Sequence, residues 1–77
     1  MPRYHFHTED GRCFPDPEGT ELPDLDAAKR EAQTVLGEIL QHDEQFWETQ
    51  HFRLLLSETA KVEDVLYSIS VEGHPGR

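Results

Sequence analysis

The chain opens with an alternation of side chains that is typical of a β-strand. Over residues 3–8, the odd-numbered side chains would point to one side and the even-numbered ones to the other. Asp10 and Gly11 follow, a pair that is typical of a tight two-residue hairpin turn. Residues 12–14 would return as a second strand, which two prolines then interrupt because proline cannot donate a backbone hydrogen bond. The pattern predicts a hairpin whose second strand lies at an edge or is bulged.

An amphipathic helix is the element that the pattern defines best. Gly19 bends the chain ahead of it, and Asp24 is a good N-cap because its carboxylate can accept hydrogen bonds from the first helical turn. The apolar residues that follow fall on one stripe at helical spacing: Leu25, Ala28, Ala32, Val35, Leu36, Ile39 and Leu40. Continuing the helix would place Asp43 in the centre of this stripe. We therefore predict a helix that ends near Gln41 or His42.

Two further segments alternate between apolar and polar residues. Residues 52–57 and 65–71 are predicted to be half-buried strands that pair as a hairpin through a looser, charged turn. The polar connection over residues 42–51 carries two large aromatic residues, Phe46 and Trp47. We expect both of them to fold back and cover the open end of the core, because a small domain has few other apolar groups to do so.

The resulting order, ββαββ, predicts an α+β fold in which one helix packs on one face of a four-stranded, mainly antiparallel sheet. We expect one domain over residues 1–72 and a flexible tail over residues 73–77. The helix would cover Tyr4, Phe6, Phe52, Leu54, Leu56, Tyr67 and Ile69. Nothing else in the chain is left to cover the other face, so we predict that a protein partner or a second copy binds there. The residues of this open face are Arg3, His5, His7, Arg53, Leu55, Leu66 and Ser68.

Composition narrows the possible partners. Among 77 residues there are 16 Asp and Glu against 7 Lys and Arg, which gives a net charge of −9. No basic run offsets this charge, so direct binding to nucleic acid or to an anionic membrane is not expected. Cys13 is the only cysteine, which fits a reducing compartment. With no apolar signal or spanning segment, the chain is expected to be cytoplasmic.

Catalysis and cofactor binding are not expected. Hydrophobic residues make up 35% of the chain, enough for one modest core layer but not for a deep substrate cavity as well. No nucleophile elbow, phosphate loop or Ser–His–Asp arrangement is present. His5, His7 and Glu9 would share one face of a strand and are the candidate ligands of a metal ion. We favour the simpler interpretation, in which His7 hydrogen-bonds a neighbouring loop and His5 is a surface residue.

A series of motifs distinguishes the first part of the chain: Pro2-Arg3-Tyr4, Phe6-His7, Asp10-Gly11, Asp16, Glu18-Gly19-Thr20-Glu21-Leu22-Pro23-Asp24-Leu25, Ala27-Ala28 and Glu31-Ala32. This series resembles an uncharacterised bacterial family of domains of unknown function. The family typically reads PRYFFH, a DG turn, D-x-EG-x-ELPDL and an Ala-rich helix. The resemblance implies a small stand-alone bacterial domain and no particular activity. His5 departs from it, because the family usually has an aromatic residue there, and so does the longer charged turn over Glu58–Asp64.

The order of elements is also similar to the antitoxin half of HicA–HicB toxin–antitoxin pairs, whose helix opens with a run like LDAAKREA. We therefore predict a small, acidic, non-enzymatic module that binds a protein partner or itself through the open face of the sheet. Two alternatives remain open at this point. One is a metal-binding domain that uses His5, His7 and nearby carboxylates, and the other is an antitoxin-like partner of a basic toxin.

Overall fold

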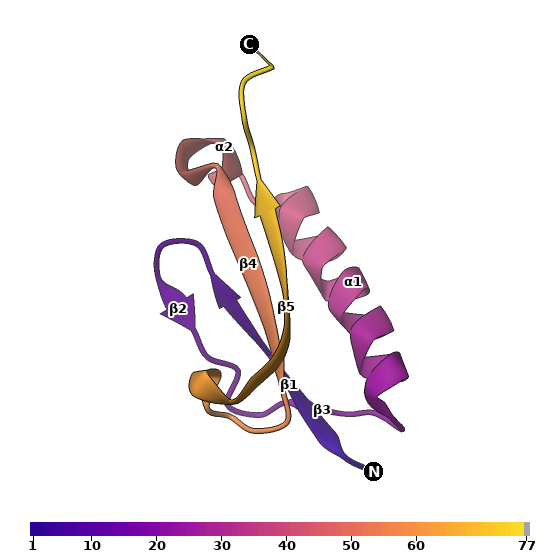
Figure 1. Ribbon diagram of the computed structural model, residues 1–77. Helices are drawn as coiled ribbons and strands as arrows, with labels where there is room; N and C mark the ends of the chain where they lie inside the picture. Colours follow the sequence, from indigo (N-terminus) through magenta and orange to yellow (C-terminus); the bar gives the residue numbers. More distant parts are fainter. Residues whose placement is uncertain (77) are drawn as a thin grey trace.

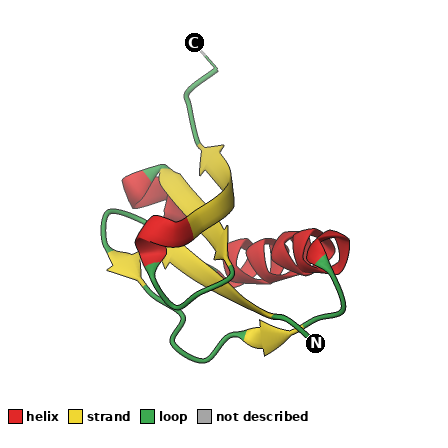
Figure 2. Ribbon diagram, turned by 60° about the horizontal axis from the view of Figure 1, so that its bottom comes forward, coloured by secondary structure: helices red, strands yellow, loops and turns green. Residues whose placement is uncertain are grey.

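The computed structural model describes residues 1–76; Arg77, the last residue of the expected tail, lies outside the described residues. The main helix lies on one side of the strands, and a short 3-10 helix with the β2–β3 loop lies on the other (Figures 1 and 2). In chain order the elements are β1 (Arg3–Glu9), β2 (Cys13–Phe14), β3 (Thr20–Glu21), α1 (Leu25–His42), α2 (Phe46–Thr49), β4 (His51–Ser57), the 3-10 helix η1 (Val62–Asp64) and β5 (Val65–Glu72).

The strands form an antiparallel sheet in the order β2-β1-β4-β5, and β3 also pairs with β1. The predicted α+β class with one main helix on an antiparallel sheet is confirmed. The sheet has five strands rather than four, because Thr20 and Glu21 pair with Tyr4 and Arg3 at the start of β1. The long strands β1, β4 and β5 make up most of the sheet, and β2 and β3 are two-residue strands that pair with the outer edge of β1.

The helix α1 has the predicted bounds and the predicted cap. The Oδ1 atom of Asp24 accepts a hydrogen bond of 2.8 Å from the backbone N–H of Ala27, and the helix ends at His42. Its apolar stripe packs on β4 and on the core side of the sheet, with Ala28, Ala32 and Leu36 buried. A cap and an uninterrupted apolar stripe are sufficient local signals to place this helix.

The core contains most of the residues expected under the helix. The buried cluster consists of Tyr4, Phe6, Ala28, Ala32, Leu36, Phe52, Leu54 and Leu56. Tyr67 departs from the prediction, because 49% of its surface is exposed, while Ile69 is only partly buried. The main sheet contact of α1 is with β4 rather than with β5.

Two local predictions are wrong. The first hairpin turns through three residues, because Glu9 pairs with Cys13, and Gly11 alone has a positive φ, of 107°. The second is the position of Trp47. Phe46 packs against the core as expected, but Trp47 is 70% exposed because both residues lie in the one-turn helix α2, whose neighbouring side chains point in different directions.

Candidate functional site

The sequence predicted that the face of the sheet opposite α1 is open. In the structure, the central part of this face is buried. His5 and Leu55 are 6% exposed, and His7 and Ser57 are fully buried. The loop between β2 and β3 passes over the two histidines and bonds to both of them through Asp16. On the same part of the sheet, η1 contacts β4. These two segments cover the central part of the face, so its buried residues are not available to a partner.

His7 is held in one tautomer by a chain of hydrogen bonds. The backbone N–H of Asp16 donates to its Nδ1 atom at 2.9 Å, so the ring proton is on Nε2. Nε2 donates in turn to Ser57 Oγ at 2.8 Å, and the Ser57 hydroxyl donates to the carbonyl of Thr59. A catalytic histidine would have to accept the serine proton, whereas this one donates to the serine oxygen. The hydrogen bonds of His7 and Ser57 therefore connect β1, β4 and two loops.

Asp16 completes the β1 edge between the two short strands that flank it. The strand β3 pairs with Arg3 and Tyr4, and β2 pairs with Thr8 and Glu9, which leaves the middle of the edge without a strand partner. In that gap the backbone N–H of Phe6 donates to Asp16 Oδ2 at 3.2 Å. A carboxylate thus takes the place of a strand carbonyl, so this edge of the sheet has no free donor at its centre.

The environment of Asp16 lowers the pKa of its carboxyl group. Partial burial raises this pKa, but donation from the backbone N–H groups of Gly19, Phe6 and Glu18, with a smaller effect of His5, outweighs it. The Oδ1 atom lies 3.1 Å from the Gly19 nitrogen and 3.3 Å from the Glu18 nitrogen. These bonds hold the ionised form, so Asp16 fixes the loop as a carboxylate.

Gly19 lets this loop lie directly against β1. Its φ is +70°, and a Cβ at this position would lie 2.8 Å from the Tyr4 carbonyl oxygen and 2.9 Å from the Cε1 atom of His5. Any side chain would therefore push the loop off the strand. Arg3 also holds the loop, because it donates to the Glu18 carbonyl at 2.9 Å and pairs with Glu21 at 3.0 Å.

The structure does not bring all three predicted metal ligands together, although the His5 and His7 rings are stacked with their centroids 6.2 Å apart. His5 Nδ1 lies 2.8 Å from the Asp16 carbonyl, and both ring nitrogens of His7 are in the hydrogen-bond chain. Glu9 instead lies 3.7 Å from Arg53 in an ion pair. Among residues 1–76, no group of three or more His, Cys, Asp and Glu side chains is placed to hold a metal ion. The favoured interpretation is confirmed for His7, which bonds a loop, and is wrong for His5, which is buried.

The opposite edge of the sheet, β5, has no strand beside it among the described residues. Alternate backbone groups of an edge strand point outward without a partner in the sheet. Residues 65–71 contain no charged residue and no proline, which are the usual means of protecting such an edge. Val65, Leu66 and Tyr67 are 36%, 43% and 49% exposed. This strand therefore presents an uncharged, partly apolar edge.

A bulge sets which side chains of β5 face the helix. Leu56 pairs with Tyr67 and Ser57 pairs with Val65, so Leu66 is an extra residue in β5. The regular part of the strand begins at Tyr67, and its odd-numbered side chains lie on the same side as the core residues of β4. The extra residue shifts the alternation, so Val65 lies on the side of Ser57 rather than under the helix.

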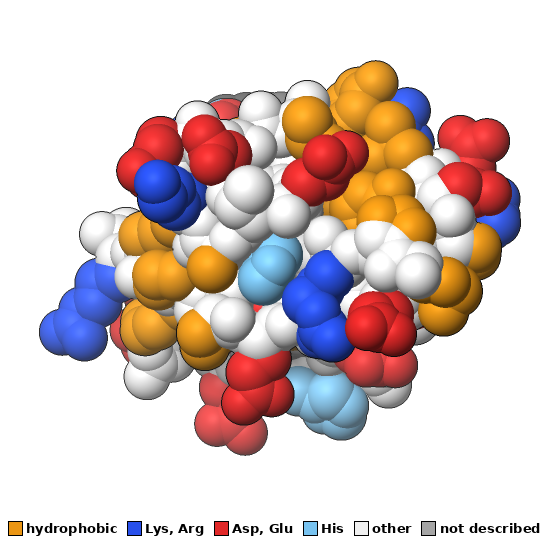
Figure 3. Space-filling view, turned by 90° about the horizontal axis from the view of Figure 1, so that it is seen from below, with side chains coloured by type: hydrophobic (Ala, Val, Ile, Leu, Met, Phe, Trp, Pro, Cys, Tyr) orange, Lys and Arg blue, Asp and Glu red, His pale blue; other side chains and the backbone are white. Residues whose placement is uncertain are grey.

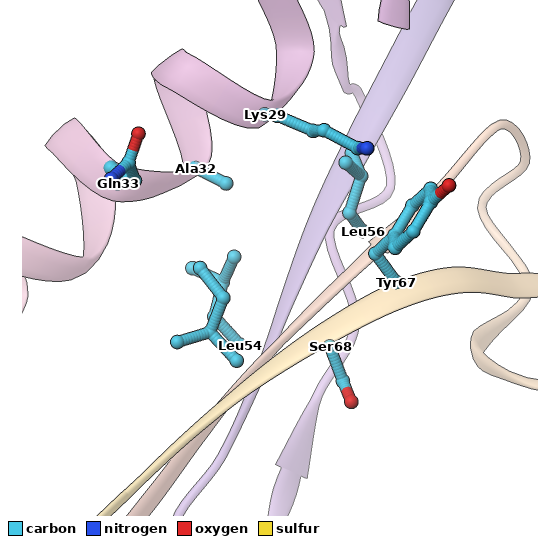
Figure 4. A pocket seen from close by; sticks show the side chains of 8 residues that line it. Lys29, Ala32, Gln33, Leu54, Leu56, Tyr67 and Ser68 are labelled. Atoms are coloured by element: carbon cyan, nitrogen blue, oxygen red, sulfur yellow. The ribbon is translucent and has the colours of Figure 1, made fainter. Parts of the chain in front are cut away.

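Beside β5 and next to α1 lies a groove of about 340 Å³. The residues that line it are Lys29, Ala32, Gln33, Leu54, Leu56, Tyr67, Ser68 and Ile69. Leu54 and Leu56 form its apolar floor, and the Lys29 ammonium lies 4.0 Å above the centre of the Tyr67 ring (Figure 4). The Ser68 side chain points away from the helix, toward the other face of the sheet (Figure 4).

The groove and the exposed strand lie in a part of the surface that carries little charge. In Figure 3 the hydrophobic side chains form a patch at the upper right and a second patch on the left, with acidic side chains between and around them. No Asp or Glu is among the groove-lining residues, although the chain has 16 of them. Residues 65–71 and the lining of the groove therefore carry no acidic side chain, although Asp64 and Glu72 flank this segment.

The seven predicted partner-binding residues end up in different environments. His5, His7 and Leu55 are buried, while Arg3 and Arg53 are in ion pairs with Glu21 and Glu9. Only Leu66 and Ser68 lie on the bare strand β5, where both are exposed. The prediction that the whole face is available to a partner is therefore wrong, and the remaining candidate surface is the β5 edge with its groove.

Sequence reasoning missed several residues that shape these two edges. In the sequence Asp16 stands out only as part of the motif series, Ser57 only as the last residue of a predicted strand, and Lys29 not at all. The Asp16-x-Glu18-Gly19 spacing was the available signal for the first, because it places a carboxylate two and three residues before backbone N–H groups. No local signal marks Ser57 or Lys29, because their partners lie far away in the sequence.

These features define a small α+β domain with one sealed sheet edge and one bare sheet edge. The chain belongs to the family described as Domain of unknown function (DUF6894), which it matches over residues 3–70. The resemblance seen in the first motifs is thus confirmed as membership of an uncharacterised family. Neither a curated protein nor a solved structure matches the chain significantly. Among the described residues, no helix is both long and apolar enough to cross a membrane.

Proposed function

We propose that this domain is a non-enzymatic interaction module that binds an extended, uncharged segment of a protein partner along β5. The segment adds a strand to the sheet, and its side chains on the helix side enter the groove beside α1. Main-chain hydrogen bonds supply affinity in this mode of recognition, and pockets for alternate side chains supply specificity. The observation that carries the proposal is the bare, uncharged edge of β5 beside an apolar groove.

The contrast with the β1 edge supports this choice of surface. At β1 the chain uses β2, β3 and the Asp16 carboxylate to satisfy the edge. At β5, residues 67–71 carry no charge and no proline, although two serines at positions 68 and 70 point away from the core and would tolerate lysine. Retaining an uncharged edge in a chain with 30% charged residues favours a binding role for that edge.

A basic toxin-like partner receives less support from the same surface. The groove contains Lys29 and no carboxylate, so it offers no complement to a basic segment. Such a partner would have to bind the acidic surface elsewhere, and its affinity would fall steeply with salt because surface charges are screened. An uncharged strand bound along β5 would show little loss of affinity with salt.

Titration with a strand-forming peptide tests the proposal. The probe is an uncharged peptide that alternates Thr with Val or Ile, added to dilute isotope-labelled protein and followed by amide NMR shifts. We expect shifts along β5 and at Lys29, Ala32 and Gln33, because these residues line the edge and the groove.

The matched variants are Ser68→Lys with Ser70→Lys, and Ser68→Thr with Ser70→Thr. The lysine pair places two charges on the edge without touching the helix side, so it should abolish the shifts, whereas the threonine pair should retain them. Shifts confined to another region, or equal binding by both double variants, would rule out β5 as the binding edge.

A further inference from the structure

We infer that the segment bound along β5 is β5 of a second copy of this chain, in an antiparallel pair with Ile69 of each copy at the two-fold axis. This inference rests on the proposed binding edge and names its occupant. In such a pair the two sheets join into one continuous sheet with both α1 helices on the same face. Both copies use the same surface, as a closed two-fold dimer requires.

The two-fold axis restricts the possible registers. In an antiparallel pair of identical strands, one residue must face its own copy, and opposite residues share a side of the sheet. With Ile69 at the axis, Tyr67 faces Val71 of the second copy on the helix side, and Ser68 faces Ser70 on the other side. An aromatic residue opposite a β-branched one, and two β-branched residues opposite each other, are favourable cross-strand pairs. All five residues of this ladder lie in the regular part of β5, beyond the bulge at Leu66.

The bulge selects this register over its neighbour. With Ser68 at the axis, Ser70 would face the bulged residue Leu66 of the second copy and Val71 would face Val65, so only residues 67–69 would pair within the regular part of β5. With Ile69 at the axis, the whole uncharged regular segment, residues 67–71, pairs with its own copy. Glu72 then faces Leu66 at each end, and no two acidic residues are opposed. The pairing therefore uses an uncharged ladder that ends at one carboxylate on each side.

The net charge gives the dimer a salt dependence opposite to that of a basic partner. Each copy carries −9, and none of the acidic side chains lies within residues 65–71 or lines the groove. Two copies repel each other over distances that salt screens, since the Debye length is about 10 Å at 0.1 M. Dimerisation should therefore become tighter as ionic strength rises, whereas binding of a basic partner would become weaker.

Sedimentation equilibrium of the full chain with charge variants at Leu66 tests both the occupant and the register. Leu66→Lys places a lysine opposite Glu72 of the second copy, and Leu66→Glu places a second carboxylate there. Both variants lose the same apolar side chain. We expect the dimer of Leu66→Glu to be weaker than that of Leu66→Lys by about tenfold in Kd, because two such pairs form per dimer. Adding Glu72→Lys to Leu66→Glu should restore the affinity to the level of Leu66→Lys.

Control variants separate the local pair from the change in net charge. Thr34 is exposed on the outer side of α1, so Thr34→Lys and Thr34→Glu change the charge by the same amounts far from β5. Their dimers should differ by much less than the Leu66 pair. A second measurement uses Ile69→Cys in a Cys13→Ser background, where oxidation should link two copies through residue 69.

Three outcomes would overturn the inference. The first is a wild-type chain that stays monomeric at millimolar concentration and high salt. The second is equal dimer affinity of Leu66→Glu and Leu66→Lys after correction by the Thr34 variants. The third is a dimer that loosens as salt rises. If the chain is monomeric but the neutral peptide still shifts β5, the second copy is excluded and the interaction module stands. If the chain neither dimerises nor shows peptide-induced shifts along β5, both proposals fail.

Discussion

The two edges of the sheet differ in how their outward-pointing backbone N–H and C=O groups are satisfied. At the β1 edge, two short strands and one carboxylate satisfy the outward backbone groups, and a loop buries His7 and Ser57 beneath it. At the β5 edge the outward groups stay free, and the neighbouring side chains are apolar and exposed. The difference teaches that the polar cluster and the surface that we propose for binding lie in different parts of the sheet. The histidines, which resemble candidate catalytic or metal-binding residues in the sequence, make structural hydrogen bonds. The edge that stays exposed is a run of serines and apolar residues.

The largest expected effect comes from Gly19, where the sealed edge has no space for a side chain. Gly19→Ala should lower the free energy of unfolding by about 3 kcal/mol, because a Cβ would contact the Tyr4 carbonyl and the backbone has a positive φ. Gly37→Ala is the matched control, since nothing lies within 4 Å of its Cβ position, and it should raise the same free energy by up to about 1 kcal/mol. Urea denaturation measures both, and equal effects would contradict the close approach of the loop.

Removing the middle of the hydrogen-bond chain should have the next largest effect. Ser57→Ala leaves the Nε2–H group of His7 buried without an acceptor and should lower the free energy of unfolding by about 2 kcal/mol. Ser70→Ala, an exposed serine on the next strand, should change it by less than about 0.5 kcal/mol. Thermal and urea denaturation give the comparison. A neutral Ser57→Ala would show that the chain of bonds does not hold this edge.

Acid should weaken the sealed edge through Asp16. Because folding lowers the pKa of this carboxyl, its contribution is fully present above the pKa of the unfolded chain, about 3.9, and is lost as the pH falls toward the folded value. Asp16→Asn should be less stable than the wild type at pH 7, and the difference should shrink as the pH falls below about 4. Denaturation at a series of pH values measures it. A difference that stays constant with pH would assign the effect of the substitution to something other than the carboxylate.

At the bare edge, substitutions should affect stability least. Lys29→Gln removes the cation above the Tyr67 ring and should lower the free energy of unfolding by about 0.5 kcal/mol. The double change of Ser68 and Ser70 to lysine should also stay within about 0.5 kcal/mol while abolishing association. Measuring the free energy of unfolding and the association affinity in the same samples separates an effect on stability from an effect on binding. A large loss of stability from the double lysine variant would mean that Ser68 and Ser70 stabilise the fold, and would contradict an exposed edge at these two positions.

Some of this arrangement is predictable from the sequence because the signals are local. The cap at Asp24 and the stripe from Leu25 to Leu40 define α1, and alternation defines the long strands. The core face follows from the same alternation. These elements need no knowledge of distant residues, since each is set by a repeat of two or of 3.6 positions.

The rest depends on contacts between residues far apart in the sequence. Asp16 reaches Phe6 only after the hairpin and loop have folded back, and Ser57 meets His7 across 50 positions. The bulge at Leu66 appears only when the two strands are paired, and it shifts which side chains face the helix. For these reasons the sequence predicted the strands but placed the open surface on the wrong part of the sheet.

Hydrogen exchange at two protein concentrations tests the account most directly. In dilute solution, the amide of Phe6 should be as protected as the core, because it donates to Asp16, while the outward amides of β5 should exchange freely. At high concentration, protection should rise along β5 from Tyr67 to Val71 and stay unchanged at Phe6. A β5 edge whose exchange does not respond to concentration, or a β1 edge that is as open as β5, would contradict the central claim.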